Sequence, residues 1–205
     1  MEIGFLAKGL IIGFCIAAPV GPIGVLCIRR TLAEGRAVGL ISGLGAATAD
    51  ATYAAIAGFG LTSVSTLLVG QQLWLRLVGG AFLLYLGVRT FAARPAERGR
   101  EATVTGLFGA FASTLALTLS NPLTVLSFAA IFAGLGVAST VHNHAAAALL
   151  VAGVFVGSMV WWVAVSVGCG STRSRFGPAG LRWVNRIAGL TIAGFGIAAL
   201  ATLGG

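Results

Sequence analysis

Charged residues are scarce in this sequence. They make up 9% of its 205 residues, whereas hydrophobic residues make up 58%, and the mean hydropathy is +1.00. A soluble domain carries roughly 25% charged residues, because its surface must be covered with groups that water solvates. The shortage therefore excludes a soluble globular protein and predicts an integral membrane protein.

Acidic residues are the scarcest charged type. Five Asp and Glu stand against thirteen Lys and Arg, which gives a net charge of +8. In a soluble chain such a balance would favour nucleic acid as a partner. Here the arginines gather between long apolar segments, as they do in the loops of membrane proteins. We therefore expect the lipid bilayer, and no nucleic acid, as the macroscopic partner.

Cysteine and histidine are also few, and their spacing carries no recognisable chemistry. Cys15, Cys27 and Cys169 lie in or beside apolar segments and lack the spacing of a disulfide framework or a zinc site. We interpret them as small apolar filler. His142 and His144 stand in a short segment without a neighbouring acid or cysteine, which favours a solvated loop. We expect no metal site and no cofactor.

Long apolar runs take the place of the missing polar surface. A helix needs about 20 apolar residues to cross the hydrocarbon of a bilayer. The runs are long and lack strict alternation, so helices are favoured over a barrel. We predict an all-α fold of six transmembrane helices at about 3–28, 37–61, 72–92, 104–135, 145–170 and 184–203.

Arginine-rich loops alternate with loops that contain neither Lys nor Arg. Arginines lie between helices one and two, three and four, and five and six, whereas 62–71 and 136–144 contain neither Lys nor Arg. Positively charged loops stay on the cytoplasmic side of a membrane. We therefore expect the three arginine-rich loops to be cytoplasmic and both termini to lie outside.

The chain also repeats itself. The segment "RLVGGAFLLYLG" at 76–87 resembles "RIAGLTIAGFGI" at 186–197, and Gly43 matches Gly153 at the same spacing of 110 positions. Because each half holds three helices, the second half enters the membrane upside down relative to the first. We predict a single transmembrane domain over 1–205, made of two inverted repeats at about 1–93 and 104–205.

Proline interrupts two of the apolar runs, in "PVGPIG" at 19–24 and in "SNPLTV" at 120–125. Proline breaks a helix from within but fits the first position of a new one. Gly21-Pro22 and Asn121-Pro122 also occupy equivalent places in the two repeats, 100 positions apart. We therefore predict that helices one and four each consist of two half-helices, with Asn121 as the cap that precedes Pro122.

Such breaks expose backbone groups inside the membrane. The N-terminus of a half-helix attracts a carboxylate, and the free carbonyls before it attract an ammonium group or a cation. Two breaks from opposite repeats would face each other near the bilayer midplane, which predicts a site for a zwitterion built from backbone. A packing kink without function is the alternative.

Asp50 is the one acid well inside a predicted span. A carboxylate there costs at least about 2.5–3.5 kcal/mol on insertion scales, so such residues mark functional sites. Burial disfavours the charged form, which would let Asp50 exchange protons. Alanines surround it at helical spacing, and Tyr53 supplies one nearby hydroxyl. The alternative is a structural partner for Arg76 or for a backbone amide.

Each of four other polar or aromatic residues has two possible roles. Arg76 and Arg186 occupy matching places near the starts of helices three and six. Each would reach the membrane interface or bind a substrate carboxylate. Trp161 and Trp162 fall in the middle of helix five, where they would pack in the core or line a cavity.

Taken together, these residues resemble the lysine exporter (LysE) family, whose members export lysine, arginine, threonine and homoserine. The resemblance lies in "GLIIGFCIAAPVGPIGVLCIRRTLAEGRAVGLISGLGAATADATYAAIAGFG", "RLVGGAFLLYLGVRTF" and "TLSNPLTVLSFAAIFAGLG". It implies a multi-pass exporter of amino acids or related small metabolites in the bacterial inner membrane, driven by the proton gradient. The family's Gly-Pro, acid and Asn-Pro carry over to Gly21-Pro22, Asp50 and Asn121-Pro122.

The sequence also departs from the family pattern. The usual Pro-Gly-Pro is here Pro19-Val20-Gly21-Pro22, with one residue inserted, and Ile23 stands where a polar residue often follows. Remote relatives carry electrons through cysteines in helices one and four, and helix four has none here. The identity of the substrate therefore stays open, and electron transfer is disfavoured.

The predicted mechanism is proton antiport by alternating access. The expected substrate-binding residues are Gly21, Pro22, Asp50, Tyr53, Asn121 and Pro122, with Asp50 as the proton-coupling group. A divalent-cation exporter and a non-transporting membrane scaffold are the alternatives. An enzyme is not expected, because an intramembrane aspartyl protease needs two acids and both histidines lie in a loop. The oligomeric state, a homodimer included, stays open.

Overall fold

The computed structural model describes residues 3–19, 21–59, 71–93, 103–121, 123–128 and 144–201. Every regular element within these ranges is helical, which confirms the predicted all-α class. The named helices are α1 (Ile3–Ala17), α2 (Pro22–Ala33), α3 (Arg36–Gly58), α5 (Gln72–Ala92), α6 (Val104–Leu119), α9 (His144–Thr172) and α10 (Pro178–Ala201), with the 3₁₀ turn η1 (Arg173–Arg175) before α10. A short helical segment occupies 123–128.

These helices agree with the predicted spans except at two places. The first half-helix pair does not end near residue 28, because α2 continues to Ala33. Arg29 and Arg30, which we placed in a loop, are helical and each only 9% exposed. They stay inside because their guanidinium groups are hydrogen-bonded to neighbouring helices. The last helix begins at Pro178, since proline fits the first turn of a helix.

Only part of the predicted transmembrane arrangement is visible in these helices. Within the described residues, α9 and α10 are long and apolar enough to cross a membrane, and α1 with α2 makes a third span if that bent pair is one crossing. With 23 and 21 residues, α3 and α5 also have the length for a crossing, but they are not among these candidate spans. The six-helix inverted repeat stays a prediction.

Glycines allow the tightest helix crossing. Gly9 and Gly13 of α1 face the backbone of α9, and Gly153 and Gly157 of α9 face the backbone of α1. A Cβ atom at any of the four would collide with backbone atoms of the other helix. Small residues promote such close approach in lipid, as the spacing of Gly153 and Gly157 predicts.

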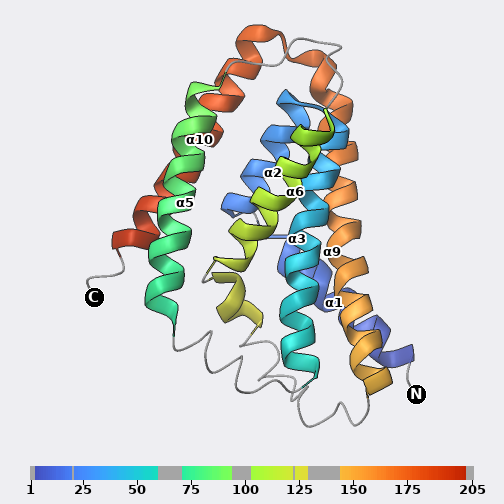
Figure 1. Ribbon diagram of the computed structural model, residues 1–205. Helices are drawn as coiled ribbons and strands as arrows, with labels where there is room; N and C mark the ends of the chain where they lie inside the picture. The colour runs from blue at the N-terminus through green and yellow to red at the C-terminus, as the bar shows by residue number, and fades with distance from the viewer. Residues whose placement is uncertain are drawn as a thin grey trace.

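The helices form two groups with α2 between them (Figure 1). In one group α9 packs against α1 and α3, and α3 also packs against α6. The other group is the pair α5 and α10. Helix α2 contacts both α3 and α10 and so links the two groups, and α5 also contacts α6.

The arginine-rich segments gather at one end of the bundle. The turn from α2 to α3, the end of α5, the start of α6 and η1 all lie at the top of Figure 1, whereas the N-terminus lies at the bottom. Arg173 of η1 donates to the carbonyls of Leu32 and Ala33, at 3.1 and 3.3 Å. We call this the arginine-rich end.

Candidate functional site

The first apolar run is broken where the sequence predicts. Helix α1 ends at Ala17 and α2 begins at Pro22, and the two are bent by 80°. Pro22 occupies the first turn of α2 and Gly21 is its N-cap, with φ −105° and ψ −168°. No side chain caps this helix start, because glycine has none to offer. The N-terminus of α2 therefore presents its backbone N–H groups inside the bundle.

The fourth apolar run is broken as well. Helix α6 ends at Leu119, and the backbone N–H of Leu123 donates to Oδ1 of Asn121 at 3.2 Å. The carbonyl of Asn121 also accepts a hydrogen bond from the N–H of Val125. Asn121 is thus the cap of the segment 123–128, as predicted, whereas Pro122 lies outside the described residues.

A cavity of about 180 Å³ lies between the two breaks, and we call it the break cavity. It brings together Gly21 and Pro22 from the first break, Asn121 from the second, and Asp50 from α3. Its described lining residues are Ile16, Ala17, Pro19, Gly21, Pro22, Ile23, Gly24, Ala46, Asp50, Thr118, Asn121, Leu123, Thr124, Ser127, Trp162 and Phe195. Four of the six predicted site residues thus surround one space.

Asp50 is held in this cavity by a neutral donor. It is 3% exposed, and the hydroxyl of Ser158 on α9 donates to its Oδ2 at 2.7 Å. The indole N–H of Trp162 donates in turn to the Ser158 oxygen at 3.2 Å. Within the described residues no cation lies within ion-pair distance of Asp50, so the predicted alternative of a partner for Arg76 finds no support.

Tyr53 lies one turn from Asp50 but does not line the break cavity among the described residues. Its hydroxyl donates to the carbonyl of Leu119 at 2.6 Å, at the last turn of α6. A helix break leaves such carbonyls without their usual partners. Tyr53 therefore supports the second break, and a direct contact with a substrate stays a prediction.

A second, larger cavity of about 360 Å³ adjoins the break cavity, and we call it the lateral chamber. The two share Pro22, Asn121, Leu123 and Phe195 in their walls. Arg76 of α5, whose role was open, lies in the wall of the lateral chamber.

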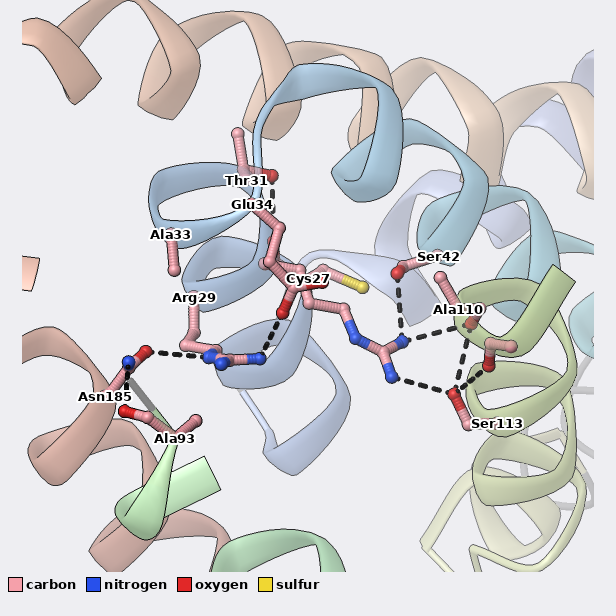
Figure 2. Close-up of polar contacts among 12 residues, drawn as sticks. Cys27, Arg29, Thr31, Ala33, Glu34, Ser42, Ala93, Ala110, Ser113 and Asn185 are labelled. Carbon is pink, nitrogen blue, oxygen red and sulfur yellow. Dashed lines mark hydrogen bonds and ion pairs between the residues drawn. The ribbon is translucent and has the colours of Figure 1, made fainter. Parts of the chain in front are cut away.

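At the arginine-rich end, α2 is tied to both helix groups by its two arginines (Figure 2). The Nε of Arg29 donates to Oδ1 of Asn185 on α10 at 2.9 Å, and Asn185 donates to the carbonyl of Ala93 at 3.0 Å. Arg29 also forms an ion pair with Glu34. Figure 2 shows this chain of contacts running from α2 toward α10.

Arg30 turns the opposite way. Its guanidinium group donates to the hydroxyls of Ser42 on α3 and of Ser113 and Thr114 on α6, at 2.8 to 3.0 Å. It also donates to the carbonyl of Ala110. Its hydrogen-bond acceptors are therefore all neutral. The two arginines together therefore bond α2 to helices on both of its sides.

The remaining candidates lie away from the break cavity, except for one tryptophan. Arg186 stacks over the rings of Phe91 and Trp183, 6.0 Å from each centroid. Trp161 packs edge-on against Phe14, whereas Trp162 lines the break cavity. His144 stacks on Phe59, and His142 lies outside the described residues. In the part of the chain that the structure describes, no group of three His, Cys, Asp or Glu side chains could hold a metal ion.

Sequence reasoning missed Ser158 and the buried roles of Arg29 and Arg30. Ser158 carried one signal, because it is a hydroxyl in the middle of a long apolar run. Nothing in the sequence paired it with Asp50, since 108 positions separate them.

A helical bundle with a broken apolar helix and a buried acid in a cavity at the break is an arrangement found in secondary transporters. The family model described as "LysE type translocator" matches residues 14–202. The chain therefore belongs to this family, which confirms the resemblance seen in its motifs.

Three curated relatives are similar over most of the chain. The "Putative amino acid efflux protein YcgF" of Bacillus subtilis is 29% identical over 91% of this chain and 90% of its own length. The "Uncharacterized membrane protein YahN" of Escherichia coli is 32% identical over 68% and 63%, respectively. The "Chemotactic transduction protein ChpE" of Pseudomonas aeruginosa is 33% identical over 77% of each chain. No solved structure matches significantly.

Proposed function

We propose that this translocator exports amino acids or closely related small metabolites across the bacterial inner membrane in exchange for protons. The observation that carries the proposal is the break cavity, where Asp50, two helix breaks and several hydroxyls surround one space. The similarity to a relative named as an amino acid efflux protein supports the substrate class.

The substrate's carboxylate binds at the starts of the half-helices, at Gly21-Pro22 and at Asn121-Pro122. Supporting this, the start of α2 lies in the cavity wall without a capping side chain. Backbone N–H groups at a helix start attract anions through hydrogen bonds and the helix dipole. The substrate's ammonium group binds beside Asp50 or at the carbonyls that precede the breaks.

Asp50 couples the export to protons. It releases a proton when the substrate's ammonium group binds, and it takes up a proton from outside after the substrate has left. Its burial and its single neutral partner, Ser158, support this role, because a charge next to it is supplied only when the substrate arrives. Differential binding of proton and substrate in two conformations then links the two movements.

The proposed topology has the arginine-rich end in the cytoplasm and both termini outside. The gathering of the arginine-rich turns at one end supports it. The helix contacts also support the two inverted repeats at about 1–93 and 104–205. If the two repeats are equivalent, the contact between α1 and α9 in the bundle has its counterpart in the contact between α6 and α3. The pairs α5–α10 and α3–α9 each join two equivalent helices. All four pairs are in contact.

The test is amino-acid efflux from cells loaded with dipeptides, which intracellular peptidases convert to free amino acids. Cells that produce the wild type are expected to release an amino acid faster than cells that lack the protein. Asp50→Asn keeps the shape and the hydrogen bond from Ser158 but cannot carry a proton, so gradient-driven efflux should be lost. Wild-type efflux in this variant would remove the proton role from Asp50.

The alternatives have less support. A divalent cation prefers several oxygen ligands with two or more carboxylates, and Asp50 is the one acid among the described residues that line the break cavity. A non-transporting scaffold would give no substrate-dependent efflux in the same assay.

A further inference from the structure

The lateral chamber is placed to receive one end of a molecule bound in the break cavity. The two spaces adjoin at Pro22, Asn121, Leu123 and Phe195. If the polar head of an amino acid lies between the breaks, as proposed above, then its side chain has this neighbouring space of about 360 Å³ to enter.

The walls of the lateral chamber are almost entirely apolar. The helices α5, α6 and α10 contribute leucines, alanines, glycines and one phenylalanine to it. Its described lining residues are Pro22, Arg76, Gly79, Gly80, Leu83, Leu117, Ser120, Asn121, Leu123, Leu126, Phe195, Ala198 and Ala199. Arg76 is the only ionisable side chain among them, and it is positive.

No acid that could neutralise a cationic substrate side chain stands among the described residues that line the lateral chamber. The whole chain contains five acids, namely Glu2, Glu34, Asp50, Glu97 and Glu101. Asp50 lines the break cavity, where the proposed function already uses it for the proton and the ammonium group. Glu34 is bonded to Arg29 at the arginine-rich end, and the other three lie outside the described residues.

A lysine or arginine side chain in the lateral chamber would leave a positive charge among apolar walls and beside Arg76. A buried charge without a partner is strongly unfavourable. An aliphatic or aromatic side chain would instead exchange water for apolar contacts. We propose that the lateral chamber is the side-chain subsite of the substrate, and that it selects amino acids with large apolar side chains over basic ones. This inference rests on the proposed export of amino acids.

The first test compares efflux rates in cells loaded with Ala-Leu, Ala-Phe or Ala-Lys. The expected result is export of leucine or phenylalanine at least about tenfold faster than of lysine at equal internal concentrations, since one unpaired charge costs more than the ~1.4 kcal/mol of a tenfold change. Lysine export that equals or exceeds leucine export would overturn the inference and leave amino-acid export intact. Export of no amino acid would sink the proposed function, and this inference with it.

The second test asks for a gain of function, which a folding defect cannot imitate. Ala198→Asp places a carboxylate in the chamber wall, and Ala198→Asn is the matched neutral control. Ala198→Asp is expected to raise the ratio of lysine to leucine efflux about tenfold over the wild type, whereas Ala198→Asn should not raise it. A ratio that is the same in both variants would show that the substrate side chain does not enter this chamber.

Discussion

Asp50 is a buried acid whose described hydrogen-bond partner is a neutral hydroxyl. Its carboxylate is buried, and within the described residues it accepts one hydrogen bond, from Ser158, which Trp162 holds in turn. A structural carboxylate in a membrane protein is normally paired with a cation. No cation lies beside Asp50 in the described part of the chain, which agrees with the proposed exchange of a proton for a substrate ammonium group.

Substitution of Ser158 tests whether its hydrogen bond positions the Asp50 carboxylate or whether Ser158 only fills space. Ser158→Ala removes the hydrogen bond to Asp50, so we expect the free energy of unfolding to fall by about 1 kcal/mol and export to slow without losing its dependence on the proton gradient. Thermal melting in detergent and efflux at several external pH values measure the two effects. A Ser158→Ala variant that loses the gradient dependence, as expected for Asp50→Asn, would show that Ser158 is itself required for coupling and does more than position Asp50.

Residues of the candidate site could be predicted from the sequence where a polar side chain interrupts an apolar run. Asp50 and Asn121 were both conspicuous because a carboxylate and an amide interrupt apolar runs. Ser158 and the neutral hydroxyls around Arg30 could not be assigned, because their meaning depends on contacts between helices far apart in the sequence.

At the scale of elements, the crossing of α1 and α9 depends on four glycines that let two backbones meet. Gly157 faces the backbone of Leu10 and Phe14, so any Cβ atom there must push the helices apart. Gly168 lies in the same helix and would meet nothing within 4 Å. The two positions form a matched pair.

We predict that Gly157→Val lowers the free energy of unfolding by roughly 1–3 kcal/mol, the cost of overpacking a tight contact. Gly168→Val should change the free energy of unfolding far less. Both substitutions restrict the backbone equally, but only the valine at position 157 would collide with another helix. Melting temperatures of the two variants in the same detergent decide between them. Equal destabilisation would mean that α1 and α9 do not cross as described.

Element boundaries show where sequence patterns reach their limit. The apolar runs and their prolines located the helices and the two breaks well, because the length of an apolar segment and the position of a proline can be read from the local sequence. They failed at the end of α2, where hydrophobicity stops near residue 28 but hydrogen bonds from Arg29 and Arg30 continue the helix to Ala33. Partners on other helices are invisible to a local pattern.

For the whole molecule, α2 links the two groups of helices by hydrogen bonds on both of its sides. Arg29 bonds to the α5–α10 pair through Asn185, and Arg30 bonds to α3 and α6 on the other side. If the arginine-rich end faces the cytoplasm and the protein works by alternating access, as proposed above, these bonds are expected to break when it opens to that side.

Cys27, which is fully buried two positions before Arg29, reports on that opening. In a background with Cys15 and Cys169 replaced by serine, Asn185→Ala should speed the labelling of Cys27 by N-ethylmaleimide about tenfold, since losing hydrogen bonds of the closed state costs about 1–3 kcal/mol. Thr191→Ala, which alters a hydroxyl bonded within α10 itself, is the control. Unchanged labelling in Asn185→Ala would show that this contact does not hold the end closed.

Reconstituted vesicles distinguish proton-coupled export through Asp50 from export that depends on another group. Vesicles that contain the protein are loaded with radiolabelled leucine, and leucine release is recorded with and without an imposed gradient that is acidic on the side opposite the arginine-rich end. The wild type is predicted to release leucine faster when the gradient is present. Asp50→Asn should show no response to the gradient while it still exchanges labelled for unlabelled leucine. Equal acceleration of the wild type and Asp50→Asn by the gradient would contradict the account.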